Sequence, residues 1–354
     1  MARLALFERA LRLPPVSILV AGWLGFLLYA HPGYLSRDAI DQLVAARSGD
    51  VCAVEPVAMT ALWKVVDFAI PGPFGMLVLQ SACFVAGIYL LIERITGQGH
   101  RTAAVAAVGV LWFPPIGATL AVIWPASLFC GLVALGAGLV ASSRSRLRIT
   151  GLLLLGFAAT LRDAGWMVTL PLVATLFAAR PHGVRRYALA LAAWLGITLV
   201  GRAAVFLTDT PAQAEPASLG DRWEGFVRVL TPDRPDGTAA YTWFTDVHDL
   251  QGSAGLIRHD GVASGLQSVL QRCARWLGTT WLFSPWLYLV IAIALVPLSP
   301  DRETIAWLVS GLASEVVLIS TQPSDATFRT SAWLVVTAVV AGLGRACRSA
   351  RRSI

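Results

Sequence analysis

The sequence predicts an all-α, polytopic membrane protein with about ten transmembrane helices. Hydrophobic residues make up 56% of the 354 residues and charged residues only 14%, a composition unlike that of soluble globular domains. The apolar residues gather in runs close to the roughly 20 residues that one membrane crossing needs. The net charge of +7 is spread in small groups of arginines between these runs, as topology signals are, which argues against nucleic-acid binding.

Ten apolar segments are candidates for the crossings. They cover residues 14–30, 74–92, 103–122, 125–141, 149–161, 165–179, 186–207, 277–297, 304–321 and 330–344. Segments 149–161 and 165–179 are interpreted as a hairpin, because arginines at both outer ends of the pair favour the same side of the membrane. The chain then divides into an N-terminal transmembrane module (1–207), an outer loop (208–276) and C-terminal transmembrane helices with a basic tail (277–354).

The arginines also predict the orientation, because short loops rich in Arg and Lys stay in the cytoplasm. Every second loop or terminus carries them: Arg3, Arg9, Arg12, Arg94, Arg101, Arg144, Arg146, Arg148, Arg180, Arg185, Arg186, Arg302, Arg345, Arg348, Arg351 and Arg352. Both termini are therefore expected inside, and the first segment is expected to remain as an anchor, since no signal-peptide cleavage site follows it. Only Lys64 among the 28 basic residues is a lysine, which is typical of a GC-rich genome and, with an outward site, favours a bacterial inner membrane.

The first outer loop, residues 31–73, is too long for a simple connection and holds two amphipathic segments. Residues 37–48 and 56–69 are expected to form juxtamembrane helices along the membrane surface. Ser36 is a candidate N-cap of the first helix.

Apolar and interfacial positions can be assigned within these two helices. In the first helix Ile40, Leu43 and Val44 are predicted to make one apolar side. In the second helix Trp63 and Lys64 are expected at the level of the lipid headgroups, where such residues gather.

Charged residues on the outward side supply the candidate site. Asp38 directly follows the first span at the membrane edge, and it is a candidate catalytic base or an acid that only stabilises a helix N-terminus. Arg162 and Asp163 fill a tight outer turn, either as a self-contained salt bridge or with Arg162 holding a phosphate, for which a planar guanidinium is well suited. The same alternatives apply to Asp325 and Arg329 before the last span, where Arg329 could also only anchor that span.

Two charged residues are predicted deeper in the membrane. Glu315 lies in an apolar run, and Arg202 lies at a comparable depth on another span. Because an unpartnered charge is costly there, we expect these two residues to pair between helices. In the outer loop, His248 and His259 stand beside acids without the spacing of metal ligands, and the five cysteines are equally scattered. The sequence therefore predicts no metal site.

The segment YLSRD at residues 34–38, followed by Asp41 and Gln42, carries a resemblance to a known family. With the order of the outer turns TLRDAG and SDATFR, it resembles the membrane-integrated GT-C glycosyltransferases, which include protein O-mannosyltransferases and lipid A aminoarabinose transferases. The chain is similar to a divergent bacterial member over most of residues 14–207 and again over 304–344. The resemblance implies a GT-C-like fold with an essential acid in the first outer loop, here Asp38.

The chain departs from the family pattern at two places. Residues 55–57 read Glu-Pro-Val where relatives have His-Pro-Pro, and residues 124–126 read Trp-Pro-Ala where many relatives have Trp-Lys-Asp. These departures keep open the alternative of a non-catalytic GT-C-fold protein that binds a lipid-linked glycan or a partner enzyme.

The resemblance and the outward charges together predict a glycosyltransferase at the outer face of the membrane. It would move a hexosyl or pentosyl group from a polyprenyl-phosphate donor to an envelope glycan, lipid or protein, with inversion at the anomeric carbon. Asp38 would be the base, with Asp41 and Glu55 as supporting acids. Cations would stabilise the departing phosphate, and the candidates are Arg37, Lys64, Arg162 and Arg329. The reaction requires no cofactor, and the participation of a divalent cation stays open.

Two other classes are compatible with many spans. An O-antigen-ligase-like transferase would place its catalytic weight on the large outer loop, so replacing His248 or His259 would distinguish it. A transporter or flippase would need a continuous polar path, whereas only Glu315 and Arg202 are predicted at depth.

Overall fold

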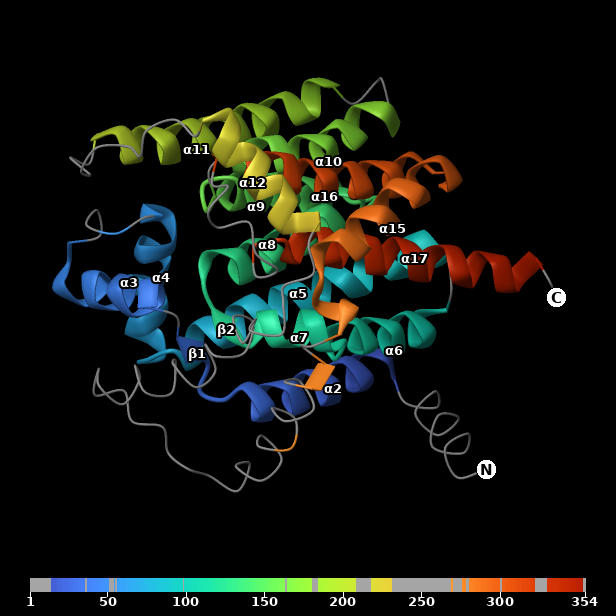
Figure 1. Ribbon diagram of the computed structural model, residues 1–354, viewed down its shortest axis with the longest axis horizontal. Coiled ribbons are helices and arrows are strands. Elements are labelled where there is room, and N and C mark those ends of the chain that lie inside the picture. The colour runs from blue at the N-terminus through green and yellow to red at the C-terminus, as the bar shows by residue number, and fades with distance from the viewer. Residues whose placement is uncertain are drawn as a thin grey trace.

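The computed structural model shows an all-α protein in which apolar helices pack side by side (Figure 1). It describes residues 14–35, 37–50, 54, 56–97, 99–162, 164–179, 184–207, 218–230, 269, 276–277, 280–299, 301–321 and 330–352. The predicted all-α class is therefore confirmed.

The ten segments predicted as crossings all coincide with helical structure. The elements are α2 (Pro15–Ala30), β1 (Tyr34–Leu35), α3 (Arg37–Ser48), α4 (Val57–Ala69), α5 (Phe74–Thr96), α6 (His100–Leu111), α7 (Pro114–Leu120), β2 (Val122–Ile123), α8 (Pro125–Val140), α9 (Ser145–Ala158), α10 (Gly165–Ala179), α11 (Val184–Leu207), α12 (Leu219–Leu230), the 3-10 helix η3 (Trp281–Phe283), α15 (Pro285–Leu298), α16 (Arg302–Thr321) and α17 (Ala332–Arg352). Proline starts α2, α8 and α15, because the first helical position needs no N–H donor and its φ suits proline.

Length and composition single out fewer crossings than the sequence analysis predicts. Among the described residues, α5, α16 and the Ala332–Ser349 part of α17 are long and apolar enough to cross a membrane alone. The bent pair α6 and α7 makes a fourth if it counts as one span. Among the described residues, the apolar helices α2, α8 and α15 are shorter than 18 residues. The chain is thus a helical membrane protein, and the number of ten crossings stays a prediction.

The segment predicted as one span at 103–122 is two helices. α6 ends at Leu111 and α7 begins at Pro114, with a bend of 71° between them. Pro114 and Pro115 explain the break, because a proline ring clashes with the preceding helical turn and provides no N–H for its hydrogen bonds. The bend leads the chain directly into β2.

The centre of the bundle is the close approach of α5 and α8. A Cβ atom on Gly87 would lie 2.2 Å from the backbone of Ala134, and one on Gly131 would lie 2.4 Å from the carbonyl oxygen of Gln80. Small residues at such crossings let backbones approach, which is how membrane helices gain packing energy without a hydrophobic driving force.

The bundle has two distinct ends. Figure 1 shows α3 and α4 at one end, and the start of α2 and the end of α17 at the other. α5 runs between them with 23 residues, which corresponds to about 34 Å at 1.5 Å per residue. The two ends are therefore separated by about the thickness of a bilayer.

A further helix, α12, lies within the segment predicted as an outer loop, and it contacts α15 and α16. The backbone N–H and hydroxyl of Ser218 donate to Oδ2 of Asp221 at 2.8 and 2.7 Å, and the Asp221 N–H donates back to the hydroxyl at 3.1 Å. This reciprocal arrangement caps the helix N-terminus in the manner of a capping box. The pair Ser218 and Asp221 is therefore a sequence signal for a helix start, which the prediction of a single outer loop at 208–276 overlooks.

Candidate functional site

The helix that carries Asp38 is tied to the start of α8. β1 pairs in parallel with β2, with Tyr34 opposite Val122 and Leu35 opposite Ile123. Gln80 of α5 supports this connection, since its Nε2 donates to the carbonyl oxygens of Leu120 and Val122 at 2.8 and 2.9 Å. All of these side chains are buried. The start of α3, which directly follows β1, is therefore held in place by the core.

Asp38 lies in the first turn of α3, and both Asp38 and Asp41 are exposed. The apolar side of α3 differs from the predicted one, because Val44 is 61% exposed. The buried positions of the helix are Ala39, Gln42, Leu43, Ala45 and Ala46. Three alanines, Leu43 and Gln42 thus face the bundle, while Asp38 and Asp41 face outward.

α4 is clamped to α3 by a bidentate ion pair. Nε and Nη2 of Arg47 donate to Oδ2 and Oδ1 of Asp67, each at 2.9 Å. These hydrogen bonds, helped by the N–H of Gly72, hold the pKa of Asp67 below its ordinary value. A Cβ built on Gly49 would lie 4.0 Å from the exposed Lys64 ammonium, which places that cation near the end of α3.

Trp63 is buried, contrary to its predicted position at the membrane surface. It was expected at the headgroup level, but it is fully buried, in the same core cluster as Met59 and Leu43. Only its neighbour Lys64 is exposed. In an amphipathic helix that packs on a bundle, the largest apolar side chain gains most from burial, and this outweighs the interfacial preference of tryptophan.

Arg162 stands at the turn between α9 and α10 and is half-buried. Its Nη1 donates to the hydroxyl of Ser314 on α16 at 3.1 Å. Its guanidinium carbon lies 5.5 Å from the ring centroid of Phe129 on α8, within the range of a cation–π contact. Phe129 follows Pro125 by four residues, or about 6 Å along the helix axis. Arg162 and α3 are thus both attached near the N-terminus of α8.

Glu315 is 2% exposed and lies beside this arginine. The hydroxyl of Ser331 donates to its Oε2 at 2.9 Å, Arg162 attracts its carboxylate electrostatically, and its Oε1 accepts no hydrogen bond within the described part of the chain. The expected pairing with Arg202 is absent, because Arg202 is exposed on α11 and no ion pair between these two described residues is present. The nearby cation is instead Arg162.

An aromatic wall holds the helices around this polar cluster. The rings of Trp307 and Trp333 meet edge to face with centroids 4.6 Å apart, and Phe129 meets Trp333 in the same manner at 6.1 Å. Nε1 of Trp333 donates to Ser310 at 3.0 Å, and Ser310 donates to the carbonyl oxygen of Val168 at 2.5 Å. Helices α8, α10, α16 and α17 are therefore fixed relative to one another beside Arg162.

No protein-family model matches this chain, and no curated protein or solved structure matches it.

The structure brings some of the predicted site residues together. Arg162 and Glu315 share one cluster, and Asp38, Asp41 and Lys64 share the α3–α4 unit. Arg202 belongs to neither. Several predicted residues lie outside the described residues, namely Ser36, Glu55, Asp163, His248, His259, Asp325, Arg329 and the side chain of Arg37. Within the described ranges, no three His, Cys, Asp or Glu side chains gather in a way that could hold a metal ion.

Sequence reasoning missed Ser314 and Ser331, which bind Arg162 and Glu315. Ser310 and Ser314 are four residues apart, so they lie on one face of α16. The spacing of these two serines, with Glu315 next to Ser314, is a sequence signal for a polar stripe along α16.

Proposed function

We propose that the protein is a membrane glycosyltransferase that moves a sugar from a polyprenyl-phosphate donor to an envelope glycan, lipid or protein. The observation that carries the proposal is the exposed Asp38 carboxylate in the first turn of α3, which β1 and β2 anchor to the same end of α8 that holds Arg162. A base and a cation at one end of a helical bundle are what transfer from a lipid phosphate needs.

The proposed site lies on the outer face of a bacterial inner membrane, and both termini lie in the cytoplasm. The sugar donor enters from the lipid, with its phosphate at the headgroup level and its sugar outside. The amphipathic helices α3 and α4 support this arrangement, because such helices lie at the membrane surface.

The reaction is a single in-line displacement. The oxygen of the acceptor hydroxyl attacks the anomeric carbon, and its proton passes to the Asp38 carboxylate. The bond from the anomeric carbon to the phosphate oxygen breaks, and its electron pair stays on the polyprenyl phosphate. Arg162 stabilises that charge, as a positioned guanidinium can without supplying a proton. The anomeric configuration is inverted.

Carrier-lipid turnover in proteoliposomes tests the proposal. Asp38→Asn removes the base while keeping its shape, so we expect sugar transfer to fall by roughly 100-fold or more. Asp50→Asn is the matched control, since Asp50 is an exposed acid just beyond the other end of α3, and it should retain wild-type turnover. Equal thermal stability of both variants would show that folding is intact.

The outcomes separate the competing functions. A fully active Asp38→Asn variant would refute the assignment of the base. A wild-type protein that co-purifies with a polyprenyl-phosphate sugar, detected by mass spectrometry, yet shows no turnover would instead be a non-catalytic glycan-binding protein.

A further inference from the structure

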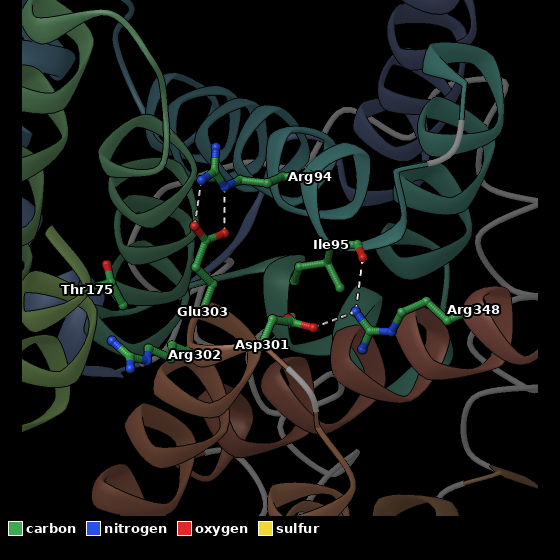
Figure 2. Close-up of a pocket in the computed structure, with 7 residues that line it drawn as sticks. All are labelled: Arg94, Ile95, Thr175, Asp301, Arg302, Glu303 and Arg348. Atoms are coloured by element: carbon green, nitrogen blue, oxygen red, sulfur yellow. Dashed lines mark hydrogen bonds and ion pairs between the residues drawn. The ribbon is translucent and has the colours of Figure 1, made fainter. Parts of the chain in front are cut away.

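A polar pocket lies at the far end of α5 from α3 and α4. Residues of α5, α10, α17 and the start of α16 line this open pocket, which has a volume of about 570 Å³ (Figure 2). Three arginines line it, Arg94, Arg302 and Arg348, together with the carboxylates of Asp301 and Glu303. Its position, about 34 Å along α5 from the start of that helix, places it at the opposite membrane boundary from Asp38. This site does not take part in the proposed transfer reaction.

Two ion pairs hold the walls of this pocket. Nε and Nη2 of Arg94 donate to Oε2 and Oε1 of Glu303, each at 2.5 Å. Nη1 of Arg348 donates to Oδ1 of Asp301 and to the carbonyl oxygen of Ile95, both at 3.0 Å. α5 and α17 are thus both fastened to the start of α16, and each carboxylate of the pocket has its own arginine.

Arg302 is the third arginine of the pocket, and neither carboxylate of the pocket pairs with it. Its side chain is exposed and makes no hydrogen bond or ion pair with the residues that the structure describes. In Figure 2 it extends along the side of the pocket where Thr175 lies. Three guanidinium groups face two carboxylates, so the pocket keeps one positive charge. The N-terminus of α16, where Arg302 stands, adds a partial positive charge from the helix dipole.

An unpaired surface arginine by itself is common, and water alone can solvate it. Here it stands in a pocket between membrane helices, with a pre-formed frame of ion pairs and a single surplus charge. Basic pockets between transmembrane helices near the membrane boundary are suited to phosphate headgroups, and the planar guanidinium matches phosphate oxygens geometrically. A single surplus charge fits a singly charged phosphate diester better than a phosphate dianion.

We propose that this pocket binds the phosphate diester of an anionic membrane phospholipid, with Arg302 as the residue that contacts the phosphate. Arg94 and Arg348 line the site but stay paired with their carboxylates. A lipid held there would link α10, α16 and α17 at one end of the bundle, and it would therefore stabilise the folded protein.

The test is a thermal titration of the purified full-length protein in detergent. Short-chain phosphatidylglycerol should raise the unfolding temperature, whereas phosphatidylcholine with the same chains should have a much weaker effect. Arg302→Gln should raise the half-maximal concentration of phosphatidylglycerol about tenfold, the effect of losing one charge-assisted contact. Arg101→Gln is the matched control, because Arg101 is exposed on α6 near the same end and does not line the pocket. It should titrate as the wild type does.

Arg302→Lys provides a second measurement, since it keeps the charge but loses the planar fork, and its half-maximal concentration should lie between those of the wild type and Arg302→Gln. The unfolding temperatures without lipid should agree among all variants. An Arg302→Gln protein that titrates like the wild type would overturn the proposal. Equal stabilisation by inorganic phosphate at the same concentration would assign the pocket to free phosphate, and it would overturn the lipid as the source.

Discussion

Glu315 is the side chain whose surroundings differ most from its expected ones. The sequence places this acid in an apolar run, and in the structure the Ser331 hydroxyl and the nearby Arg162 lie beside it. A buried charge is tolerated when hydrogen bonds and an opposite charge compensate its lost hydration. The Ser331 hydroxyl is therefore expected to contribute directly to stability.

A double-mutant cycle measures that contribution. Ser331→Ala removes the donor to Oε2 of Glu315, and it should cost about 1.5 to 3 kcal/mol of folding free energy, as hydrogen bonds to charged groups do. In a Glu315→Gln background the bond is between neutral groups, so the same change should cost about 1 kcal/mol. Thermal or denaturant unfolding of the purified protein gives both values.

Ser320→Ala is the control for this cycle, because Ser320 lies on α16 and is exposed, and its effect should stay within about 0.5 kcal/mol. If Ser331→Ala costs the same free energy in both backgrounds, Ser331 does not stabilise the carboxylate.

At the level of single residues, the sequence predicts residue types better than partners. Asp38 and Asp41 are both exposed on α3, and their outward side was predictable because the polar residues of this segment follow a local helical pattern. The partner of Glu315 could not be predicted, since Arg162, Ser314 and Ser331 come from segments far apart in the chain. Trp63 was misplaced for the same reason, because its burial depends on how α4 packs on α3 and α5.

Among the elements, the contact between α5 and α8 sets the tightest constraint. Gly87 and Gly131 allow their backbones to meet, and any side chain at either position must push the two helices apart. Gly109 on α6 is different, because a Cβ there would have no heavy atom within 4 Å.

These two glycines give opposite predictions for the same substitution. Gly87→Ala should destabilise the protein by about 1 to 3 kcal/mol or more, because the new Cβ overlaps the Ala134 backbone and the core cannot relax freely. Gly109→Ala should stabilise it by about 0.5 to 1 kcal/mol, since alanine loses less conformational entropy in a helix. Unfolding of the two variants in the same detergent checks both signs. Destabilisation of equal size at both positions would show that the close approach is not what constrains Gly87.

Helices were predictable from local signals, and their breaks less so. The hydrophobic runs locate α5, α16 and α17, and proline marks the starts of α2, α8 and α15. The same rule applied to Pro114 and Pro115 would have divided the 103–122 segment, but its continuous apolar composition favoured one span. α12 was missed because its capping residues lie within a long polar segment. The sequence alone does not indicate which glycines lie at helix crossings, because this depends on the tertiary packing.

For the molecule as a whole, the arrangement of its ends limits the topology. The start of α2 and the end of α17 lie toward one end of the bundle, and α3 and α4 lie at the other end (Figure 1). The loop arginines predict which of these ends faces the cytoplasm. The packing of the helices does not indicate which end lies on which side of a membrane, so the orientation depends on the loop arginines alone.

Labelling of single cysteines tests the orientation that the proposed transfer reaction requires. Asp50→Cys places a thiol at the α3 end, and Ser143→Cys places one between α8 and α9, and both positions are exposed. With the native cysteines replaced, an impermeant maleimide should label Asp50→Cys on intact bacterial spheroplasts. It should label Ser143→Cys only after the membrane is permeabilised, because α8 connects the two sides. The reverse pattern would put Asp38 in the cytoplasm, where an outward-facing sugar could not reach it, and labelling of both on intact spheroplasts would mean that α8 does not cross the membrane.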